Sequence, residues 1–191
     1  MVNAISPLQP LRGAGQFGAS GKRGVTIKEV TGFGLLQFSA WGGTLAQTGT
    51  EAARVAGCGE APEPGRVVSG FNGILMRVEP LKWWLVTPAD SSHPKPELAA
   101  EEGAVLDMQD ARCWLRITGD KTETLLNHFL PLNLRPSVFF DGAVASTAFH
   151  HVGVTLWRDA DGLNLLLPRS SALSLWQLLS ESAHQYGLVE E

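Results

Sequence analysis

The chain has 191 residues, of which 44% are hydrophobic and 18% are charged, and its formal net charge is −4. This length accommodates one large domain or two small, tightly joined ones, and the apolar fraction is sufficient for a buried core. The small negative charge offers no basic surface for nucleic acid, so we do not expect a nucleic-acid-binding protein.

The N-terminal segment, residues 1–24, is rich in Gly, Pro and Ser, which predicts an extended arm rather than a packed element. Residues 1–20 contain no apolar leader core, and no stretch of the chain approaches the roughly 20 apolar residues that span a bilayer. We therefore expect a cytoplasmic protein without a membrane partner. After the arm, residues 25–191 are expected to form a single α+β domain of two subdomains, about 25–109 and 110–191.

Short strands and one helical pattern alternate in the first of these subdomains. Apolar and polar residues alternate at 74–79, the period of a strand with one buried face. Pro80 and Pro88 end this strand and the next one. A weak helical spacing covers residues 44–56, and one or two helical turns are expected at 97–102. The predicted strands are residues 25–27, 35–40, 74–79, 83–86 and 105–108.

The second subdomain has clearer patterns. Cys113, Leu115 and Ile117 alternate with more polar neighbours and predict a strand with one dry face. A helix follows from Gly119 and ends before Pro131, with acidic residues in its first turn, where the helix dipole favours them. The remaining elements are an irregular loop at 131–142, strands at 145–150, 152–158 and 163–167, a hairpin turn at 159–162, and a helix from Ser170 or Ser171 that Gly187 ends.

Hairpin turns between neighbouring strands imply antiparallel pairs. The expected fold class is therefore α+β, with two interleaved strand–helix halves whose helices pack on antiparallel or mixed sheets, rather than a doubly wound parallel sheet.

Two sequence patterns invite a cofactor or metal interpretation. The run Gly13–Gly18 matches the spacing G-x-G-x-x-G, but a dinucleotide site needs a preceding strand and a following helix, and neither is predicted here. His150 and His151 are adjacent in a predicted strand, where neighbours point to opposite faces and cannot easily chelate one ion. We expect one histidine to be buried with a hydrogen-bond partner and the other to lie at an interface.

Other candidate reactive groups lack the partners that their chemistry requires. Cys58 lies in a Gly-rich loop without a second cysteine or a basic cluster that would lower its pKa, and Cys113 is expected to be a small buried hydrophobe. Asp107 and Asp110 could act as paired carboxylates, although turn residues at a strand end are the favoured interpretation. No G-x-S-x-G motif is present. We therefore expect no catalytic, cofactor-binding or metal-binding residue on this chain.

The six tryptophans indicate contact surfaces instead. Trp83 and Trp84 are adjacent in a predicted strand, so they face opposite sides. Trp114 lies opposite the dry face of its strand. Surplus aromatic faces are enriched at the centres of protein interfaces, while a second internal layer that covers them is an equally good interpretation.

An ordered set of motifs in the second half resembles a known family. Residues 107–120 resemble the strand–turn–helix start of aminomethyltransferase-like, folate-binding domains. With residues 130–136, Phe139, Gly142, Thr147, His150, residues 166–170 and residues 175–176, the set closely resembles the gamma subunit family of heterotetrameric sarcosine oxidase. The N-terminal segments 11–13, 24–27 and 84–86 also fit.

The resemblance implies a division of labour. In that family the complex oxidatively demethylates sarcosine to glycine; the flavins FAD and FMN, NAD and a tetrahydrofolate site lie on large subunits, and zinc lies on another small subunit. It implies alpha, beta and delta subunits as partners and no cofactor on this chain. Folate-dependent relatives place a catalytic Asp just after the helix, where this sequence has Asn133, and an amide cannot serve as a general base.

Three functions remain open from the sequence. The first is a non-catalytic gamma subunit that acts in assembly and stability of sarcosine oxidase. The second is the small subunit of a related N-methyl amino acid dehydrogenase, and the third is a folate-binding, aminomethyltransferase-like protein that acts alone. The candidate interface residues are the 1–24 arm with Arg12, and Trp83, Trp84, Trp114 and Arg116.

Overall fold

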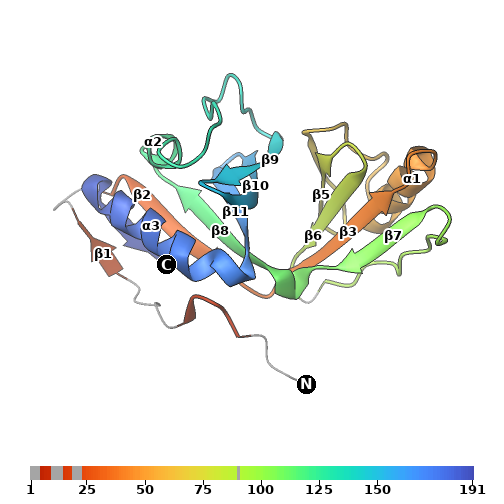
Figure 1. Ribbon diagram of the computed structural model, residues 1–191, viewed down its shortest axis with the longest axis horizontal. Helices are drawn as coiled ribbons and strands as arrows, with labels where there is room; N and C mark the ends of the chain where they lie inside the picture. The colour runs from red at the N-terminus through yellow and green to blue at the C-terminus, as the bar shows by residue number, and fades with distance from the viewer. Residues whose placement is uncertain (1–4, 10–14, 19–22, 90) are drawn as a thin grey trace. The chain divides into compact units, whose positions relative to one another are not determined.

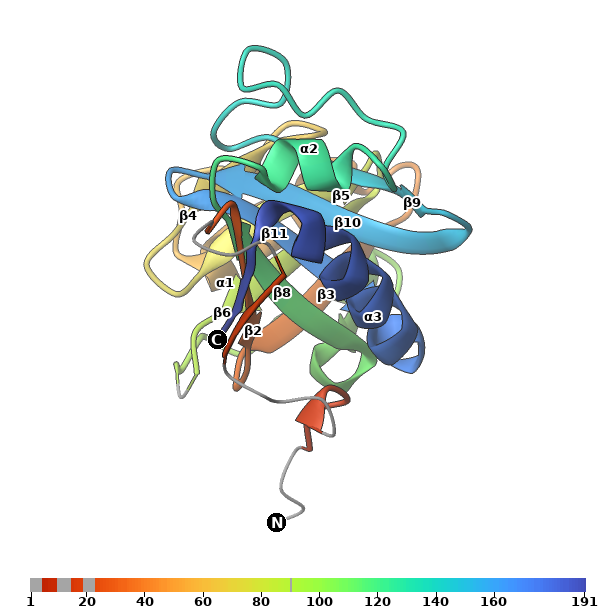
Figure 2. The same ribbon diagram turned by 90° about the vertical axis from the view of Figure 1, so that its left-hand side faces the viewer.

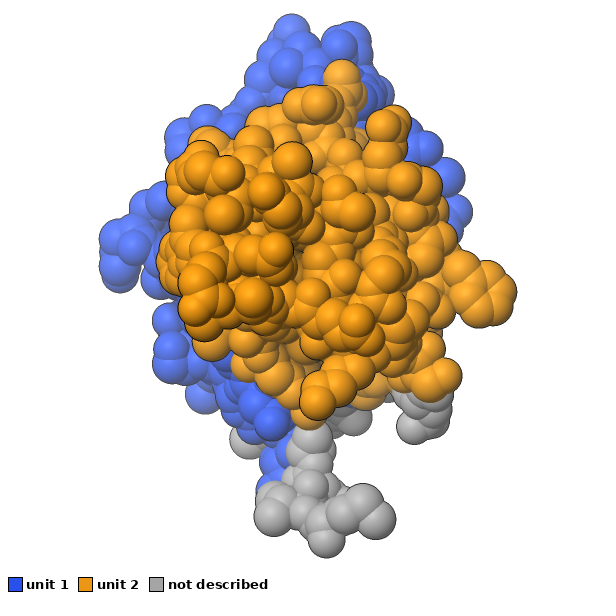
Figure 3. All heavy atoms as spheres, turned by 90° about the vertical axis from the view of Figure 1, so that its right-hand side faces the viewer, with its two compact units in different colours: residues 1–31, 110–141, 146–191 blue, residues 32–109, 142–145 orange. Residues whose placement is uncertain are grey.

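The computed structural model describes residues 5–9, 15–18, 23–89 and 91–191. Arg12 and the first part of the Gly13–Gly18 motif lie outside the described residues. The chain forms two compact units, which Figure 3 colours separately. Unit 1 comprises residues 1–31, 110–141 and 146–191, and unit 2 comprises residues 32–109 and 142–145.

Unit 1 contains a mixed seven-stranded sheet with the order β1-β12-β2-β8-β11-β10-β9 (Figure 1). Its central pairs, β2–β8, β8–β11 and β10–β11, are antiparallel, and β12 pairs with β2 in parallel. The strands are β1 (Gly15–Phe17), β2 (Val25–Val30), β8 (Arg112–Thr118), β9 (Val144–Phe149), β10 (Val152–Asp159), β11 (Gly162–Pro168) and β12 (Leu188–Glu190).

The alternation in β8 places its apolar residues on one buried face. Cys113, Leu115 and Ile117 are at most 3% exposed, while the intervening side chains are half-buried. The helices of this unit are α2 (Thr122–Leu126) and α3 (Ala172–Ala183). Figures 1 and 2 show α3 against the sheet near β2 and β8. Its buried stripe follows helical spacing, and each fully buried Leu contributes about 1.5–3 kcal/mol.

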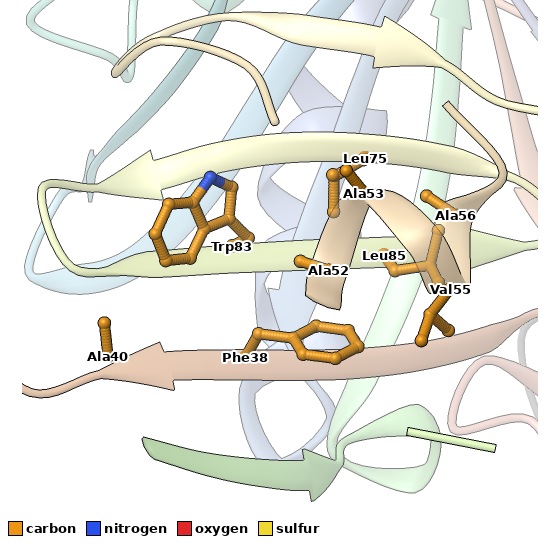
Figure 4. Close-up of a cluster of buried hydrophobic side chains, with 9 residues drawn as sticks. All are labelled: Phe38, Ala40, Ala52, Ala53, Val55, Ala56, Leu75, Trp83 and Leu85. Carbon is orange, nitrogen blue, oxygen red and sulfur yellow. The ribbon is translucent and has the colours of Figure 1, made fainter. Parts of the chain in front are cut away.

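Unit 2 contains a five-stranded antiparallel sheet with the order β4-β5-β6-β3-β7 and one helix. The elements are β3 (Gly34–Ala40), α1 (Leu45–Ala56), β4 (Val67–Ser69), β5 (Ile74–Glu79), β6 (Lys82–Thr87) and β7 (Gly103–Asp107). The core forms where α1 packs on β3, β5 and β6, as Figure 4 shows. It contains Phe38, Ala40, Ala52, Ala53, Val55, Ala56, Leu75, Trp83 and Leu85.

Strand β2 belongs to unit 1 although it lies in the first half of the sequence. Five of its residues, Thr26–Val30, are in antiparallel register with β8. The chain therefore enters unit 1, forms most of unit 2 from residue 32 onward, and returns to unit 1 at residue 110, with residues 142–145 again in unit 2.

The described part of the N-terminal arm is packed, in contrast to the expectation. Residues 15–17 pair with β12, and Leu8 is 2% exposed. Gly18 has a φ of +82° and lies so close to the His184 carbonyl that a side chain would clash. The motif with dinucleotide spacing therefore contains an edge strand at Gly15–Phe17 rather than a strand-to-helix turn.

Of the one or two helical turns predicted at residues 97–102, the structure has a single hydrogen-bonded turn, in which the amides of Glu102 and Gly103 both donate to the Ala99 carbonyl. Tertiary hydrogen bonds hold the rest of the segment in an irregular conformation. The Glu97 amide donates to the Glu51 carboxylate, and the hydroxyls of Thr44 and Thr48 both donate to the Glu102 carbonyl. The helix predicted from Gly119 is only five residues long, Thr122–Leu126, and continues as turns to Leu130. Among the described residues, no helix is long and apolar enough to cross a membrane.

Candidate functional site

The loop that follows α2, residues 130–143, is where the resemblance places a catalytic carboxylate. Asn133 is exposed there, and its Oδ1 accepts a hydrogen bond of 3.2 Å from the Arg135 amide. This is a local turn contact, in which a side-chain oxygen fixes the backbone two residues later. Asn133 thus serves the conformation of the loop.

Arg158 of β10 holds this loop. Its Nε donates to the Phe139 carbonyl at 2.6 Å, and its Nη2 donates to the Leu134 carbonyl at 2.6 Å and to Glu123 Oε1 at 2.8 Å. The Arg158 side chain is 14% exposed. The planar guanidinium donates to several acceptors at once. It therefore fixes the loop to α2 and to the sheet, and these contacts involve no reactive group.

The loop presents apolar side chains to solvent. Val138 is 55% exposed and Phe140 is 38% exposed, while Leu134 and Phe139 are buried. Helix α3 adds Leu173 and Leu178 on its outer side, each 40% exposed. Unit 1 therefore carries exposed apolar residues on a loop and a helix whose inner faces are fully packed.

Trp114 and Arg116, two of the candidate interface residues, belong to a polar network in unit 1. The Trp114 Nε1 donates to Oδ1 of Asn164 at 3.0 Å, and the fully buried Asn164 donates through Nδ2 to Asp159 Oδ2 at 2.8 Å. The Arg116 Nη2 contacts Asp159 at 3.2 Å and Asp161 at 2.8 Å. The Trp114 ring also packs on Trp157 with 5.2 Å between the centroids.

This network completes the β10–β11 hairpin. Asp159 Oδ1 also accepts hydrogen bonds from the amides of Asp161 and Gly162, both at 3.0 Å, so the turn predicted at 159–162 is fixed by its own carboxylate. Buried polar groups are stable where every member has a partner. Trp114 and Arg116 are thus held in place, and both remain half-buried.

Trp83 and Trp84 lie in unit 2 and are both buried, at 1% and 6% exposure. The Trp84 Nε1 donates to Oε1 of Gln37 at 3.0 Å. Trp83 packs in the core beneath α1 (Figure 4), and the Arg77 guanidinium lies 4.9 Å from its ring centroid. The Trp83 Nε1 is buried without a hydrogen-bond partner. Strand β6 is thus buried on both of its faces at these two positions.

A groove of 710 Å³ lies in unit 2 along α1, and we call it the α1 groove. Gly43 lines it just before the helix, Gly49 and Ala53 line it from the helix, and residues 58–61, Arg77 and Trp83 complete the lining. The buried Gly49 lets α1 pack closely on the Trp83 indole, since a Cβ there would meet Cζ2 at 3.4 Å.

Unit 2 also projects one aromatic side chain. Phe71 is 95% exposed at the tip of the β4–β5 turn. The turn is held against the end of α1: the amides of Phe71 and Asn72 donate to the carbonyls of Gly57 and Ala56, and Asn72 Nδ2 donates to the Val55 carbonyl at 2.9 Å. The turn thus caps the helix, and Phe71 extends from a fixed backbone.

The two cysteines are both shielded from solvent, Cys58 in part and Cys113 almost completely. Cys58 lines the α1 groove and is half-buried, and this burial raises the pKa of its thiol. Its Sγ lies 3.4 Å from the Glu60 carbonyl. Cys113 is buried, as expected, with Sγ 3.6 Å from Glu29 Oε1. A raised pKa keeps a thiol protonated and weakly nucleophilic at neutral pH.

The histidine pair is arranged differently from the expectation. His150 and His151 form the two-residue turn between β9 and β10, and both are exposed, so neither is the buried histidine that was predicted. His150 adopts a φ of +53°, and its ring makes edge contacts with Phe129 and Phe149. Across the described segments, no group of three or more His, Cys, Asp or Glu residues is arranged to hold a metal ion.

The carboxylates Asp107 and Asp110 are turn residues. Asp107 ends β7 and its Oδ1 accepts from the Gln109 amide at 3.1 Å, and Asp110 lies in a short 3₁₀ turn. Both are exposed. The exposed Phe71, the Arg158 contacts and the α1 groove are features that sequence reasoning missed. A Gly-Phe-Asn-Gly run at 70–73 is the one sequence signal that could have located Phe71 at a turn tip.

No protein-family profile matches this chain. Among curated proteins, the gamma subunit of sarcosine oxidase from Corynebacterium sp. (strain U-96) is 28% identical over 156 residues, which cover 80% of this chain and 75% of that protein. The resemblance to sarcosine oxidase gamma subunits, inferred from the ordered motifs, is thereby confirmed.

Solved structures extend the comparison to the fold. A chain of heterotetrameric sarcosine oxidase from Corynebacterium sp. U-96, in complex with pyrrole 2-carboxylate, matches with a TM-score of 0.70 and 22% identity over 89% of each chain. Aminomethyltransferase T of the glycine cleavage system from Bartonella henselae matches with a TM-score of 0.60 and 13% identity, over 88% of this chain and 48% of that one. The α+β class and the likeness to part of an aminomethyltransferase are confirmed.

Proposed function

We propose that this chain is the gamma-type subunit of a heteromeric sarcosine oxidase and acts in assembly and stability of the complex. The observation that carries the proposal is the 28% identity to a gamma subunit over 80% of the chain. The match to a chain of heterotetrameric sarcosine oxidase over 89% of both chains supports it. The relevant reaction of the whole complex is the oxidative demethylation of sarcosine to glycine.

We assign no catalytic step to this chain. The polar groups that could take part in catalysis have structural roles instead. Asn133 fixes a turn, Asp159 closes a hairpin, and Arg158 holds the loop at 130–143. Burial raises the pKa of the Cys58 thiol and so disfavours its nucleophilic form. What the chain offers a complex is a shaped surface with apolar side chains.

The cofactors and remaining subunits belong to the same proposal. FAD, FMN, NAD, zinc and tetrahydrofolate are assigned to partner subunits, and the partners are alpha, beta and delta chains of the same oxidase. A complex of this kind acts in the cytoplasm, on a small amino acid. The support is that the similar proteins are a gamma subunit of sarcosine oxidase and a chain of a heterotetrameric sarcosine oxidase.

Contact with the partners is assigned to the exposed apolar residues on fixed backbone. Phe71, Val138 and Phe140 are the leading candidates, because held aromatic and apolar groups lose little entropy on binding. Trp114 and Arg116 keep partial exposure and stay in the proposed interface, as does Arg12. Trp83 contacts a partner only through the α1 groove, which it lines. Trp84 is buried and supports the interface indirectly, by packing its own strand.

An omission experiment tests this function. The large subunits are expressed with and without this chain, and soluble yield, flavin content and sarcosine turnover are measured. We expect loss of soluble, flavin-loaded complex without the chain. Unchanged assembly and turnover in its absence would contradict the proposal.

The same preparations separate the alternatives. A higher rate with another N-methyl amino acid than with sarcosine would identify a related dehydrogenase. Calorimetry of the isolated chain with tetrahydrofolate is expected to give no binding heat. Binding there, with turnover by the chain alone, would support a folate-dependent enzyme that needs no partner.

A further inference from the structure

One side of α1 binds the main chain of residues 91–102, and we call this segment the strap. Thr44, Thr48 and Glu51 follow one another at helical spacing, so they lie on the same side of the helix. Hydrogen bonds from this side all reach main-chain groups of the strap. They join Trp41 Nε1 to the Ala100 carbonyl, the hydroxyls of Thr44 and Thr48 to the Glu102 carbonyl, the Glu51 carboxylate to the Glu97 amide, and Arg54 Nη2 to the Lys95 carbonyl.

The strap contributes almost nothing to the core of unit 2. None of residues 91–102 is buried, and none belongs to the cluster of apolar side chains between α1 and the sheet. The segment has no regular helix or strand. Segments with few buried apolar contacts open locally at a smaller free energy than the core unfolds. Release of the strap therefore leaves the core of unit 2 in place.

Both ends of the strap are anchored in the sheet. The chain reaches it from β6 and leaves it into β7, and both strands pair with β3. Gly103, the first residue of β7, is buried, and a Cβ there would lie 2.4 Å from the Ser39 carbonyl oxygen. Because this close approach fixes the start of β7 against β3, the strap can leave α1 while the strands keep their register.

Glu51 lies at the centre of the strap's contacts. Among the residues that the structure describes, it is the only charged side chain that is buried, at 9% exposure. Arg54 Nε and Nη2 each donate to one of its carboxylate oxygens at 2.8 Å. A buried carboxylate is stable only when it is paired and hydrogen-bonded, and the Glu97 amide completes its partners.

Opening of the strap does not leave this charge unpaired. Arg54 belongs to the same helix as Glu51 and stays beside it, and water can replace the Glu97 amide. The cost of opening is therefore the hydrogen bonds between α1 and the strap. Bonds to ionised groups are roughly twice as strong as neutral ones, so Glu51 and Arg54 supply the largest share.

We propose that the strap opens from α1 as one unit, at a smaller free energy than the unfolding of unit 2, and that Glu51 is its latch. Opening exposes a row of hydrogen-bond donors and one carboxylate on α1, and the fold of unit 2 is kept. The device belongs to this chain alone and does not depend on the proposed function.

Hydrogen exchange of the full-length chain, followed by NMR, tests the opening. The amides of Glu97, Ala99 and Glu102 report on the strap, because each donates to a group that the strap or its latch supplies. We expect these amides to share one protection factor, about tenfold or more below that of the amides of α1. Low urea should speed exchange in α1 but not in the strap, since opening exposes little apolar surface.

Two variants test the contacts that hold the strap. Glu51→Gln removes the charge and keeps an acceptor, and it should speed strap exchange by about tenfold. Trp41→Phe removes the bond to the Ala100 carbonyl from a side chain that is 48% exposed, so folding is not at risk, and it should speed strap exchange several-fold. Unchanged strap exchange in Glu51→Gln would remove its role as the latch, and unchanged exchange in both variants would overturn the proposal.

Asn72→Ala is the matched control, because it weakens unit 2 at a contact outside the strap. It removes the bond from Asn72 Nδ2 to the Val55 carbonyl at the other end of α1. We expect faster exchange in α1 and unchanged exchange in the strap. Equal acceleration of the α1 and strap amides by Asn72→Ala would show that the strap opens only when unit 2 unfolds, which contradicts the proposal.

Discussion

Replacing Arg158 with Met is expected to release the loop at 130–143 while keeping most of the side chain's apolar volume. The substitution removes the hydrogen bonds to the carbonyls of Phe139 and Leu134 and the ion pair with Glu123. Phe139 and Leu134 are 8% and 0% exposed, so water does not easily replace the lost donors. The loop should open locally and lower the stability of unit 1.

The magnitude follows from the partners. A hydrogen bond from a charged donor contributes about 1.5–3 kcal/mol. Two such bonds to buried carbonyls give about 3–6 kcal/mol. The contact with Glu123, whose side chain is 34% exposed, adds less than about 1 kcal/mol because solvent screens it. For a chain of this size, each kcal/mol shifts Tm by about 2–4 °C, so the two carbonyl bonds alone predict a decrease of about 6–24 °C.

Differential scanning calorimetry measures the Tm, and hydrogen exchange followed by mass spectrometry locates the change. We expect faster exchange in residues 130–143 for Arg158→Met. Glu123→Gln is the control, because it removes the charge and keeps an acceptor, and it should cost less than about 1 kcal/mol. A Tm within 2 °C of the unsubstituted protein, with unchanged exchange in the loop, would refute the role that we assign to Arg158.

Three further perturbations follow from the structure. Hydrogen bonding from Arg54 lowers the pKa of Glu51, so this carboxylate stabilises the fold above its unfolded pKa and the benefit is lost as pH falls through the lowered folded pKa. The Tm difference between the unsubstituted chain and Glu51→Gln should be largest at pH 7 and should shrink once the pH falls below about 4.3, the ordinary pKa of a glutamate. Gly119→Ala places a Cβ 2.3 Å from the Gly24 carbonyl at a φ of +112° and should cost about 2 kcal/mol or more in urea unfolding, while Gly153→Ala should leave stability unchanged or slightly higher. Phe71→Ala should change stability by less than about 0.5 kcal/mol and weaken binding of the large subunits, and normal binding would remove Phe71 from the interface.

Regular patterns in the sequence predicted most of the longer strands of the two sheets. The alternation around Cys113 and Leu115 predicts β8, and the turn at 159–162 predicts the β10–β11 hairpin, because both signals are local. The three-residue strands β1, β4 and β12 were missed, since three residues are too few to show a period of two. The pairing of β12 with β1 and β2 also depends on partners distant in the sequence.

The exposed surface was also hard to predict, because it too depends on contacts between residues distant in the sequence. Adjacent strand positions place Trp83 and Trp84 on opposite faces, yet both are buried: Trp83 packs in the core beneath α1, and Trp84 donates to Gln37 of the neighbouring strand. Of the one or two turns predicted at 97–102, only the turn that Ala99 closes forms, and the Glu97 amide is bound instead by Glu51, which lies 46 residues earlier. Tertiary hydrogen bonds of this kind produce no local pattern in the sequence.

Native mass spectrometry of the complex, purified through a tag on this chain, tests the central claim most directly. The account predicts a single assembly in which one copy of this chain is bound to larger subunits that carry the flavins. Recovery of the chain alone, or only as a homo-oligomer, from cells that also produce the large subunits would contradict it.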